Sequence, residues 1–257
     1  MKPELSLTTA KPEGYVFPTS QLGYLSPLPV VDAMHHEFYQ AVPRGMVFVS
    51  YALSVSAFTE VAALKAVTRA DEGFDYLKRR NVDRVIFGGL PVSSFVGRAA
   101  MLQLMKKASD KYGFEVSNDF EDTIEALRHL GAHRVAVAAK WRAPVMDAVV
   151  RYLTDAGLDV AGSHGSDYDA ADVMLVDTVN SVGAAIELGR GALEKNPGVD
   201  ALVLGGGTWL AIPATSQLEK EFGLPVVSNM LASSWSAARF AGVETARHLA
   251  CRLLEKA

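Results

Sequence analysis

Two glycine-rich turns are the segments of this chain best suited to bind a ligand. Each follows a short apolar run, and they read Gly88-Gly89-Leu90-Pro91 and Gly205-Gly206-Gly207-Thr208-Trp209. Glycine lets a backbone approach a ligand closely, and the N-terminus of the following helix offers unpaired N–H groups to an anion. Neither turn matches the dinucleotide motif G-x-G-x-x-G or a phosphate loop ending in Gly-Lys-Ser/Thr, which disfavours NAD and ATP. We therefore expect the turns to hold a carboxylate or an enediolate.

Hydroxyl and amide side chains near these turns form a second group of candidates. Neutral donors aimed at a developing oxyanion are what a carbon-acid reaction needs. The same residue types also cap helices for local reasons, so both interpretations stay open. The candidates are Ser93, Ser94, Ser117, Asn118, Thr208, Ser228 and Asn229.

Lys140 is the ionisable residue that points most directly to catalysis. It ends the apolar run VAVAAK just before Trp141 and Arg142. A partly desolvated lysine there can act as a base or bind a carboxylate, and Trp141 can form a wall of the pocket. The alternative is a solvated lysine at the exit of a strand.

His35 is the second catalytic candidate, because it follows the first predicted strand and would lie beside the cleft. With His36 and Glu37 it forms a run that invites a metal interpretation. Consecutive helical residues point in directions about 100° apart and do not face one ion, so we expect no metal here. Because the glycine turns match no nucleotide-binding motif, we also expect no cofactor. Cys251, the single cysteine, lies at helical spacing with leucines and is expected to serve packing.

The elements that position these residues alternate between strands and helices, which is typical of a parallel α/β sheet. An apolar run, a glycine turn, a helix and a segment ending in Ser-Asn occur twice, which pairs Ser117-Asn118 with Ser228-Asn229. This repeat predicts an α/β fold of two pseudo-twofold-related lobes, each a parallel sheet flanked by helices, with the active-site cleft between them. The predicted strands are 22–27, 46–53, 84–89, 114–118, 134–140, 158–162, 201–207 and 225–229. We expect residues 1–20 to form an N-terminal arm, 21–117 plus 229–257 to form lobe 1, and 118–228 to form lobe 2.

Composition narrows the class of partner. The chain has 257 residues, of which 49% are hydrophobic, and a net charge of −4, which argues against nucleic-acid binding. No uncharged apolar stretch reaches the roughly 18 residues of a membrane span. A single cysteine fits a cytoplasmic location, and a homo-oligomer is expected from base rates. We expect the partner to be a small-molecule carboxylate.

The strand Leu22–Pro27, the two glycine turns and the segment Gly223–Gly242 resemble the arylmalonate decarboxylase and maleate isomerase branch of the aspartate/glutamate racemase superfamily. The resemblance implies a cysteine at the strand end of each lobe, but those positions fall within Gly88–Pro91 and Gly205–Gly207. Two-cysteine racemisation and a covalent thioether adduct are therefore not expected. The resemblance also implies that Pro27 closes the first strand and that Trp141 lines the pocket.

These observations together predict a cofactor-independent lyase, decarboxylase-like, that acts on a small carboxylic acid through an enolate-like intermediate between the lobes. The alternatives are a cysteine-independent isomerase or hydrolase of a small dicarboxylate, or a non-catalytic carboxylate-binding protein. Lys140 or His35 would handle the proton. The predicted substrate-binding residues are Pro27, Gly88, Gly89, Leu90, Ser93, Ser94, Ser117, Asn118, Trp141, Gly206, Gly207, Thr208, Trp209, Ser228 and Asn229.

Overall fold

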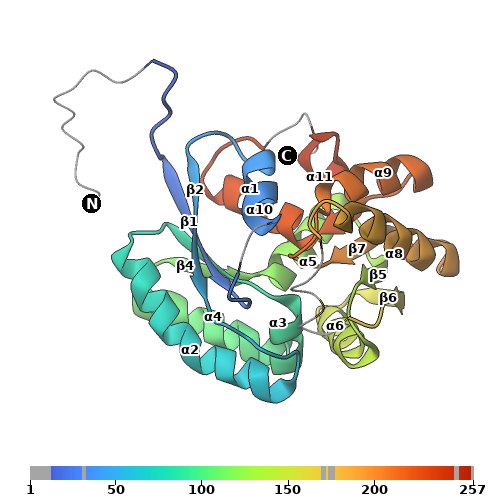
Figure 1. The fold of residues 1–257 in the computed structure, drawn as a ribbon, viewed down its shortest axis with the longest axis horizontal. Helices are drawn as coiled ribbons and strands as arrows, with labels where there is room; N and C mark the ends of the chain where they lie inside the picture. Colours follow the sequence, from blue (N-terminus) through green and yellow to red (C-terminus); the bar gives the residue numbers. More distant parts are fainter. Residues whose placement is uncertain (1–12, 31–32, 169–171, 173–176, 246–248, 256–257) are drawn as a thin grey trace.

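The computed structural model describes residues 13–30, 33–168, 172, 177–245 and 249–255. Within them, two four-stranded parallel sheets form the framework (Figure 1). The first sheet has the order β2-β1-β3-β4 and the second has the order β6-β5-β7-β8. Residues 1–12 of the predicted N-terminal arm lie outside the described residues.

The strands of the first sheet are β1 (Ser20–Ser26), β2 (Met46–Ala52), β3 (Arg84–Phe87) and β4 (Glu115–Asn118). Those of the second are β5 (Arg134–Ala139), β6 (Asp159–His164), β7 (Ala201–Gly205) and β8 (Val226–Ser228). Every strand pairing is parallel. The inner strands β3 and β7 are buried along their whole length, as expected for strands covered on both faces.

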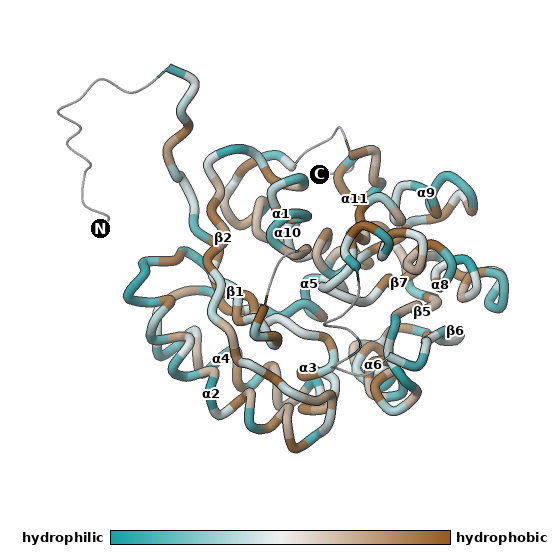
Figure 2. Tube along the Cα trace, viewed as in Figure 1, coloured by the Kyte–Doolittle hydropathy of each residue, from teal (hydrophilic) through white to brown (hydrophobic). Residues whose placement is uncertain are grey.

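The helices are α1 (Ala33–Ala41), α2 (Glu60–Arg79), α3 (Leu90–Val96), α4 (Arg98–Tyr112), α5 (Asp119–Leu130), α6 (Ala143–Asp155), α8 (Ser181–Lys195), α9 (Ile212–Phe222), α10 (Asn229–Phe240) and α11 (Arg252–Glu255). Helices α2 and α4 cover the first sheet and α8 and α9 the second (Figure 1). Along α2, α4 and α9 hydrophobic and hydrophilic residues alternate (Figure 2), as expected for helices with one face on a sheet. No described helix is long and apolar enough to cross a membrane.

The two sheets repeat one another, because each places its first and third strands in the middle and its second and fourth at the edges. Helix α5 follows the fourth strand of the first sheet and α10 follows the fourth strand of the second. These equivalent helices pack on each other between the sheets (Figure 1). The prediction of two related α/β lobes is thus confirmed, whereas the exact lobe boundaries stay a prediction. Because each helix directly follows its strand, α5 with Asp119 is grouped with the first sheet and its lobe, and α10 with Asn229 is grouped with the second.

One hydrophobic core runs through both lobes. It joins Leu25 and Val85 of the first sheet to Val135 and Val203 of the second. The lobes therefore share buried surface and are not separate domains on a linker.

Helix α1 ties the first lobe to the second through Glu37. Its Oε1 accepts a hydrogen bond of 2.6 Å from the backbone N–H of Ile212, at the start of α9, and its Oε2 has no partner among the described residues. Burial raises the pKa of this carboxyl from 4.5 to about 7, although the backbone hydrogen bonds from Ile212 and Ala211 oppose the shift. The ionised form is therefore costly in the folded protein.

We expect Glu37→Gln to raise stability at pH 8 and to have no such benefit at pH 4. Between pH 4.5 and about 7 the folded wild type binds more protons at Glu37 than the unfolded chain does, so stability falls as pH rises through this range. Glutamine removes this dependence and keeps the acceptor for Ile212. Thermal midpoints of wild type and variant at both pH values measure the effect, with Glu194→Gln on the exposed face of α8 as control. Equal midpoints at pH 8 would contradict the prediction.

Candidate active site

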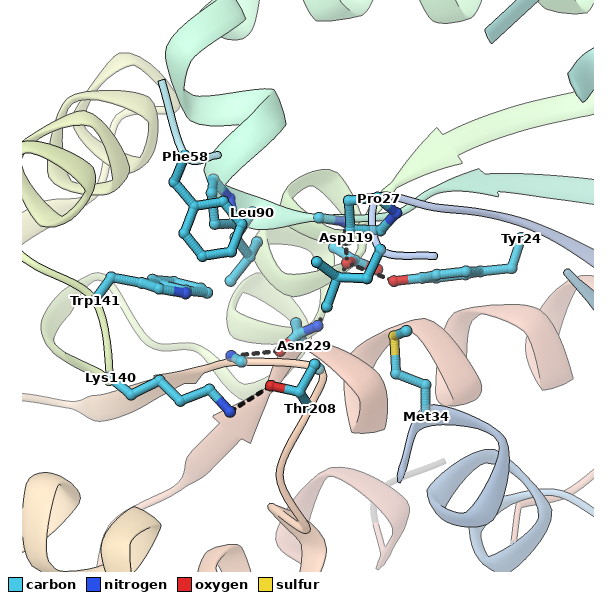
Figure 3. A pocket seen from close by; sticks show the side chains of 15 residues that line it. Tyr24, Pro27, Met34, Phe58, Leu90, Asp119, Lys140, Trp141, Thr208 and Asn229 are labelled. Atoms are coloured by element: carbon cyan, nitrogen blue, oxygen red, sulfur yellow. Dashed lines mark hydrogen bonds between the residues drawn. The ribbon is translucent and has the colours of Figure 1, made fainter. Parts of the chain in front are cut away.

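A pocket lies between the lobes at the carboxyl ends of the inner strands (Figure 3). Open parallel sheets bind their ligands at this edge. Most of its wall is apolar, and a few polar groups converge on it, as is usual for small-molecule sites. The residues that line it are Tyr24, Pro27, Leu28, Met34, Phe58, Gly89, Leu90, Pro91, Asp119, Lys140, Trp141, Gly206, Gly207, Thr208 and Asn229.

Lys140 enters this pocket from the end of β5 and is only 1% exposed. Its Nζ donates a hydrogen bond of 2.5 Å to Oγ1 of Thr208 and lies 4.8 Å from the centre of the Trp209 ring. The alternative of a solvated lysine is therefore wrong. A buried ammonium beside apolar walls is a strong binding group for an anion.

The apolar part of the pocket is formed by side chains from both lobes. Phe58 and Leu90 of the first lobe lie close to Trp141 of the second (Figure 3), and the Phe58 and Trp141 rings meet edge to face with centroids 6.4 Å apart. On another side Met34 of α1 packs beside the second glycine turn, where a Cβ on Gly207 would come within 2.8 Å of its sulfur. The pocket therefore has apolar side chains from both lobes in its wall.

The glycine turns are bound by side chains of the protein itself. The N–H of Gly89 donates to Oδ2 of Asp119 at 2.9 Å, and the N–H of Gly206 donates to Oδ1 of Asn229 at 3.0 Å. Both glycines have positive φ, 100° and 143°. These two N–H groups are thus already bound within the protein, while Gly89, Gly206 and Gly207 line the pocket and their role in binding an anion stays a prediction.

These hydrogen bonds also correct the alignment of the internal repeat. Asn118 caps α5 by accepting from the N–H of Glu121, and Ser228 caps α10 by accepting from the N–H of Leu231. Asn118 therefore matches Ser228, and Asp119 matches Asn229. The sequence repeat paired these residues one position out of register.

Several predicted substrate-binding residues have other structural roles and do not line the pocket. Ser117 donates to Asp122 and Ser94 to the carbonyl of Pro91. Asn118 and Ser228 are the helix caps, Trp209 packs behind Lys140, and Ser93 is buried within α3. Of the predicted substrate-binding residues, the pocket brings together Pro27, Gly89, Leu90, Trp141, Gly206, Gly207, Thr208 and Asn229.

His35 does not line the pocket, so the prediction that it lies in the cleft is wrong. Its Nε2 is 3.4 Å from Oγ of Ser50, and its ring packs on Phe48. Met34 and Glu37 occupy the buried face of α1, which leaves His35 on the partly exposed side. Cys251 is fully buried in the hydrophobic core, in keeping with the packing role expected for it.

Gly88 does not line the pocket either, because it makes space for Tyr24. A Cβ at Gly88 would come within 2.2–2.4 Å of three atoms of the Tyr24 side chain. The Tyr24 hydroxyl in turn donates to Oδ2 of Asp119 at 3.0 Å. Gly88 therefore acts on the pocket indirectly, through the position of this phenol.

We expect Gly88→Ala to lower the free energy of unfolding by roughly 3 kcal/mol, since the buried Tyr24 ring must move to accept the methyl group. Urea unfolding monitored by circular dichroism measures the loss. Gly183→Ala is the matched control, because it lies inside α8 with no atom within 4 Å of the added carbon. That control should gain up to about 1 kcal/mol from helix propensity. Similar stabilities for the two variants would refute the packing role of Gly88.

Four other pocket residues had little signal in the sequence, namely Asp119, Tyr24, Met34 and Phe58. Asp119 is one of three acidic residues in the first turn of α5, where acids are common because they complement the helix dipole. The other three are hydrophobic or aromatic residues of a kind that fills any core. Only the fold distinguishes them as pocket residues.

Comparison with known proteins agrees with this geometry. A family model described as arylmalonate decarboxylase matches residues 25–254. The chain belongs to the arylmalonate decarboxylase family. The expected branch of the racemase superfamily is thus confirmed, and so is the prediction of an enzyme, because the family and the relatives below are enzymes.

Two relatives of known function match parts of the chain. Arylmalonate decarboxylase of Bordetella bronchiseptica is 27% identical over 167 residues, which are 65% of this chain and 68% of that protein. Maleate isomerase of Nocardia farcinica is 31% identical over 135 residues, which are 52% of this chain and 51% of that protein. The match to the isomerase thus spans about half of each protein.

Solved structures share the fold over nearly the whole chain. A liganded double mutant of arylmalonate decarboxylase has a TM-score of 0.85 at 22% identity and covers 93% of this chain and 100% of its own. Maleate isomerase Iso of Pseudomonas putida S16 has a TM-score of 0.79 at 18% identity and covers 91% and 98%. At these identities the likeness concerns the fold alone.

In this member of the arylmalonate decarboxylase family the glycine turns have little room for a side chain. A Cβ at Gly89 would lie 2.7 Å from Cγ of Pro27, and one at Gly206 would lie 2.6 Å from Nε1 of Trp209. Their positive φ values add backbone strain to any substitution. A side chain at Gly89 or Gly206 is therefore disfavoured, whereas a Cβ at Gly205 would meet its nearest neighbours, Leu90 and Trp141, at 3.2 Å.

Proposed function

We propose that the protein is a cofactor-independent lyase that removes CO2 from a small carboxylic acid through an enolate-like intermediate. The observation that carries this proposal is the buried Lys140–Thr208 pair inside a mostly apolar pocket between the lobes. The names of the relatives support a substrate of the arylmalonate type, in which two carboxylates share one carbon.

The pocket supplies two environments for such a substrate. Lys140 and Thr208 hold the carboxylate that is retained, while the departing carboxylate faces apolar walls such as Leu90. Its charge is poorly solvated there, whereas the charge that develops on the retained oxygens is stabilised by the ammonium. Binding is thus stronger in the transition state than in the ground state, which is the condition for catalysis.

The bond changes are few. The C–C bond to the departing carboxylate breaks, CO2 leaves, and the electron pair forms an enolate whose oxygens face Lys140 and Thr208. A proton then adds to the carbon. The aromatic slot beside Trp141 would hold an aryl or alkyl substituent of that carbon.

Isomerisation of a dicarboxylate is the second candidate, because the match to a maleate isomerase has 31% identity. A covalent thioether has no thiol to form it at either glycine turn, so an isomerase of this kind would have to work without one. This favours the lyase.

The test is ¹H NMR of phenylmalonate, methylmalonate and maleate incubated with the protein in D2O. Loss of one carboxylate with deuterium at the α-carbon is the expected result for phenylmalonate. Conversion of maleate to fumarate would favour the isomerase instead. Ligands that raise the thermal midpoint yet stay unchanged and unlabelled would point to a non-catalytic binding protein and refute the lyase.

A further inference from the structure

Asp119 has a carboxyl group in the pocket that takes no part in the binding and bond-breaking steps proposed above. It is the first residue of α5 and is 1% exposed. Among the described residues it is the only carboxyl group that lines the pocket. A buried ionisable group in a ligand pocket is a candidate for acid–base chemistry.

The second lobe shows what Asp119 would need for a purely structural role. Its structural equivalent Asn229 accepts the N–H of Gly206 at 3.0 Å, as Asp119 accepts the N–H of Gly89 at 2.9 Å. An amide is therefore sufficient to hold the turn. The carboxyl in the first lobe adds one property that the amide lacks, which is the ability to carry a proton.

Resting on the lyase activity proposed above, we infer that Asp119 is the catalytic acid that delivers the proton to the enolate carbon. It does so from the lobe opposite Lys140, so the anion and its proton donor lie on different sides of the pocket (Figure 3).

The hydrogen bonds around Asp119 allow both of its protonation states. Oδ2 accepts from the N–H of Gly89, the Tyr24 hydroxyl and Nδ2 of Asn229, while Oδ1 accepts from the Ser233 hydroxyl at 3.1 Å. A hydroxyl can rotate and accept instead of donate, so Ser233 can receive the proton of a neutral carboxyl. The site thus accommodates the acid before transfer and the carboxylate after it.

The electrostatic surroundings favour the neutral acid. Burial raises the pKa of the Asp119 carboxyl above its usual range, against the opposing effect of its hydrogen bonds. Tyr24 faces it from β1, Asn229 and Ser233 face it from α10, and Asp122 lies one turn along its own helix and is paired with Arg84. Lys140 is the cation across the pocket.

Asp119 loses and regains one proton in each turnover. After CO2 leaves, the Asp119 O–H bond breaks and its proton bonds to the α-carbon of the enolate, which gives the product monocarboxylate. The Asp119 carboxylate then regains a proton from water. No oxidant, metal or further reactant is needed.

The test compares Asp119→Asn with wild type on phenylmalonate. The substitution keeps the acceptor for Gly89, as Asn229 demonstrates in the other lobe, so a folded variant is expected. We expect kcat to fall by about 100-fold or more and KM to change little. The wild-type rate should decrease as pH rises, because the ionised Asp119 has no proton to donate, and this decrease should be absent in the variant. Asp110→Asn is the control, because it replaces an acid of α4 whose side chain is 65% exposed, and it should leave kcat and its pH profile unchanged. An Asp119→Asn variant that keeps its kcat within about fivefold and the pH profile of wild type would overturn the inference.

A second readout does not depend on turnover. Infrared difference spectra of wild type minus Asp119→Asn should show a protonated carboxyl band that shifts when phenylacetate binds. A band that is absent or unaffected by phenylacetate would overturn the role of Asp119. If wild type binds phenylacetate with this shift but leaves phenylmalonate, methylmalonate and maleate unchanged, the lyase proposal fails and an acidic Asp119 in contact with ligand remains.

Discussion

Replacing Lys140 with methionine is expected to lower kcat for phenylmalonate by about 100- to 1,000-fold, because the ammonium proposed to stabilise the developing enolate is removed. Affinity for the product phenylacetate should fall by about 10- to 100-fold, as expected for the loss of a charge-assisted hydrogen bond. The fold should survive, because Lys140 is 1% exposed and methionine fills a similar volume without a buried charge. Steady-state kinetics, calorimetric titration with phenylacetate and a thermal melt measure the three effects.

Two controls separate the charge of Lys140 from its surroundings. Lys106→Met removes an ammonium whose side chain is 75% exposed and should change none of these quantities. Thr208→Val keeps the ammonium but removes its hydroxyl partner, and a loss of about tenfold in kcat is expected. A Lys140→Met protein that binds phenylacetate as wild type does would show that the carboxylate lies elsewhere.

The sequence was sufficient to predict the two-lobe fold because both sheets are parallel and covered on both sides. Inner strands such as β3 and β7 then consist mostly of apolar residues, and all eight predicted strands are present. Their order within each sheet had no signal in the sequence, since it depends on which runs pair across the crossovers. The shared order of the two sheets came only with the structure.

Part of the site was predictable because parallel sheets bind ligands at the carboxyl ends of their strands. Lys140 and Trp141 come just after β5 and Thr208 comes shortly after β7, and all three line the pocket. Asp119 was missed because the cap pair was aligned one residue out of register, and a single residue decides which side chain at the start of a helix turns inward. The prediction for His35 was wrong for a similar reason, because the orientation of α1 brings its neighbour Met34 to the pocket instead.

The buried Arg84–Asp122 ion pair links the first sheet to both central helices, α5 and α10. Nη2 of Arg84 on β3 donates to Asp122 on α5 at 2.9 Å, and Nη1 donates to Ser236 on α10 at 2.8 Å. Their side chains are 5% and 1% exposed. Burial raises the pKa of Asp122 to about 6, and the positive charge of Arg84 limits the shift. The pair therefore controls how much charge the centre of the molecule carries.

We expect Arg84→Met to lower the free energy of unfolding by roughly 3 kcal/mol at pH 8, because Asp122 is left buried and ionised without its cation. In wild type, ionisation of Asp122 lowers the free energy of unfolding as pH rises to about 6, and above that pH this loss is complete. Without Arg84 the pKa of Asp122 should rise further, so the variant should continue to lose stability above pH 6. The deficit should accordingly be smaller at pH 5.5. Urea unfolding at both pH values measures it, with Arg134→Met as control, since that arginine pairs with Asp159 at the surface with both side chains 48% exposed. The double variant Arg84→Met/Asp122→Leu should recover much of the lost stability, because it removes both charges. If Arg84→Met loses the same free energy of unfolding at both pH values, the loss comes from packing of the arginine side chain and not from the charge of Asp122.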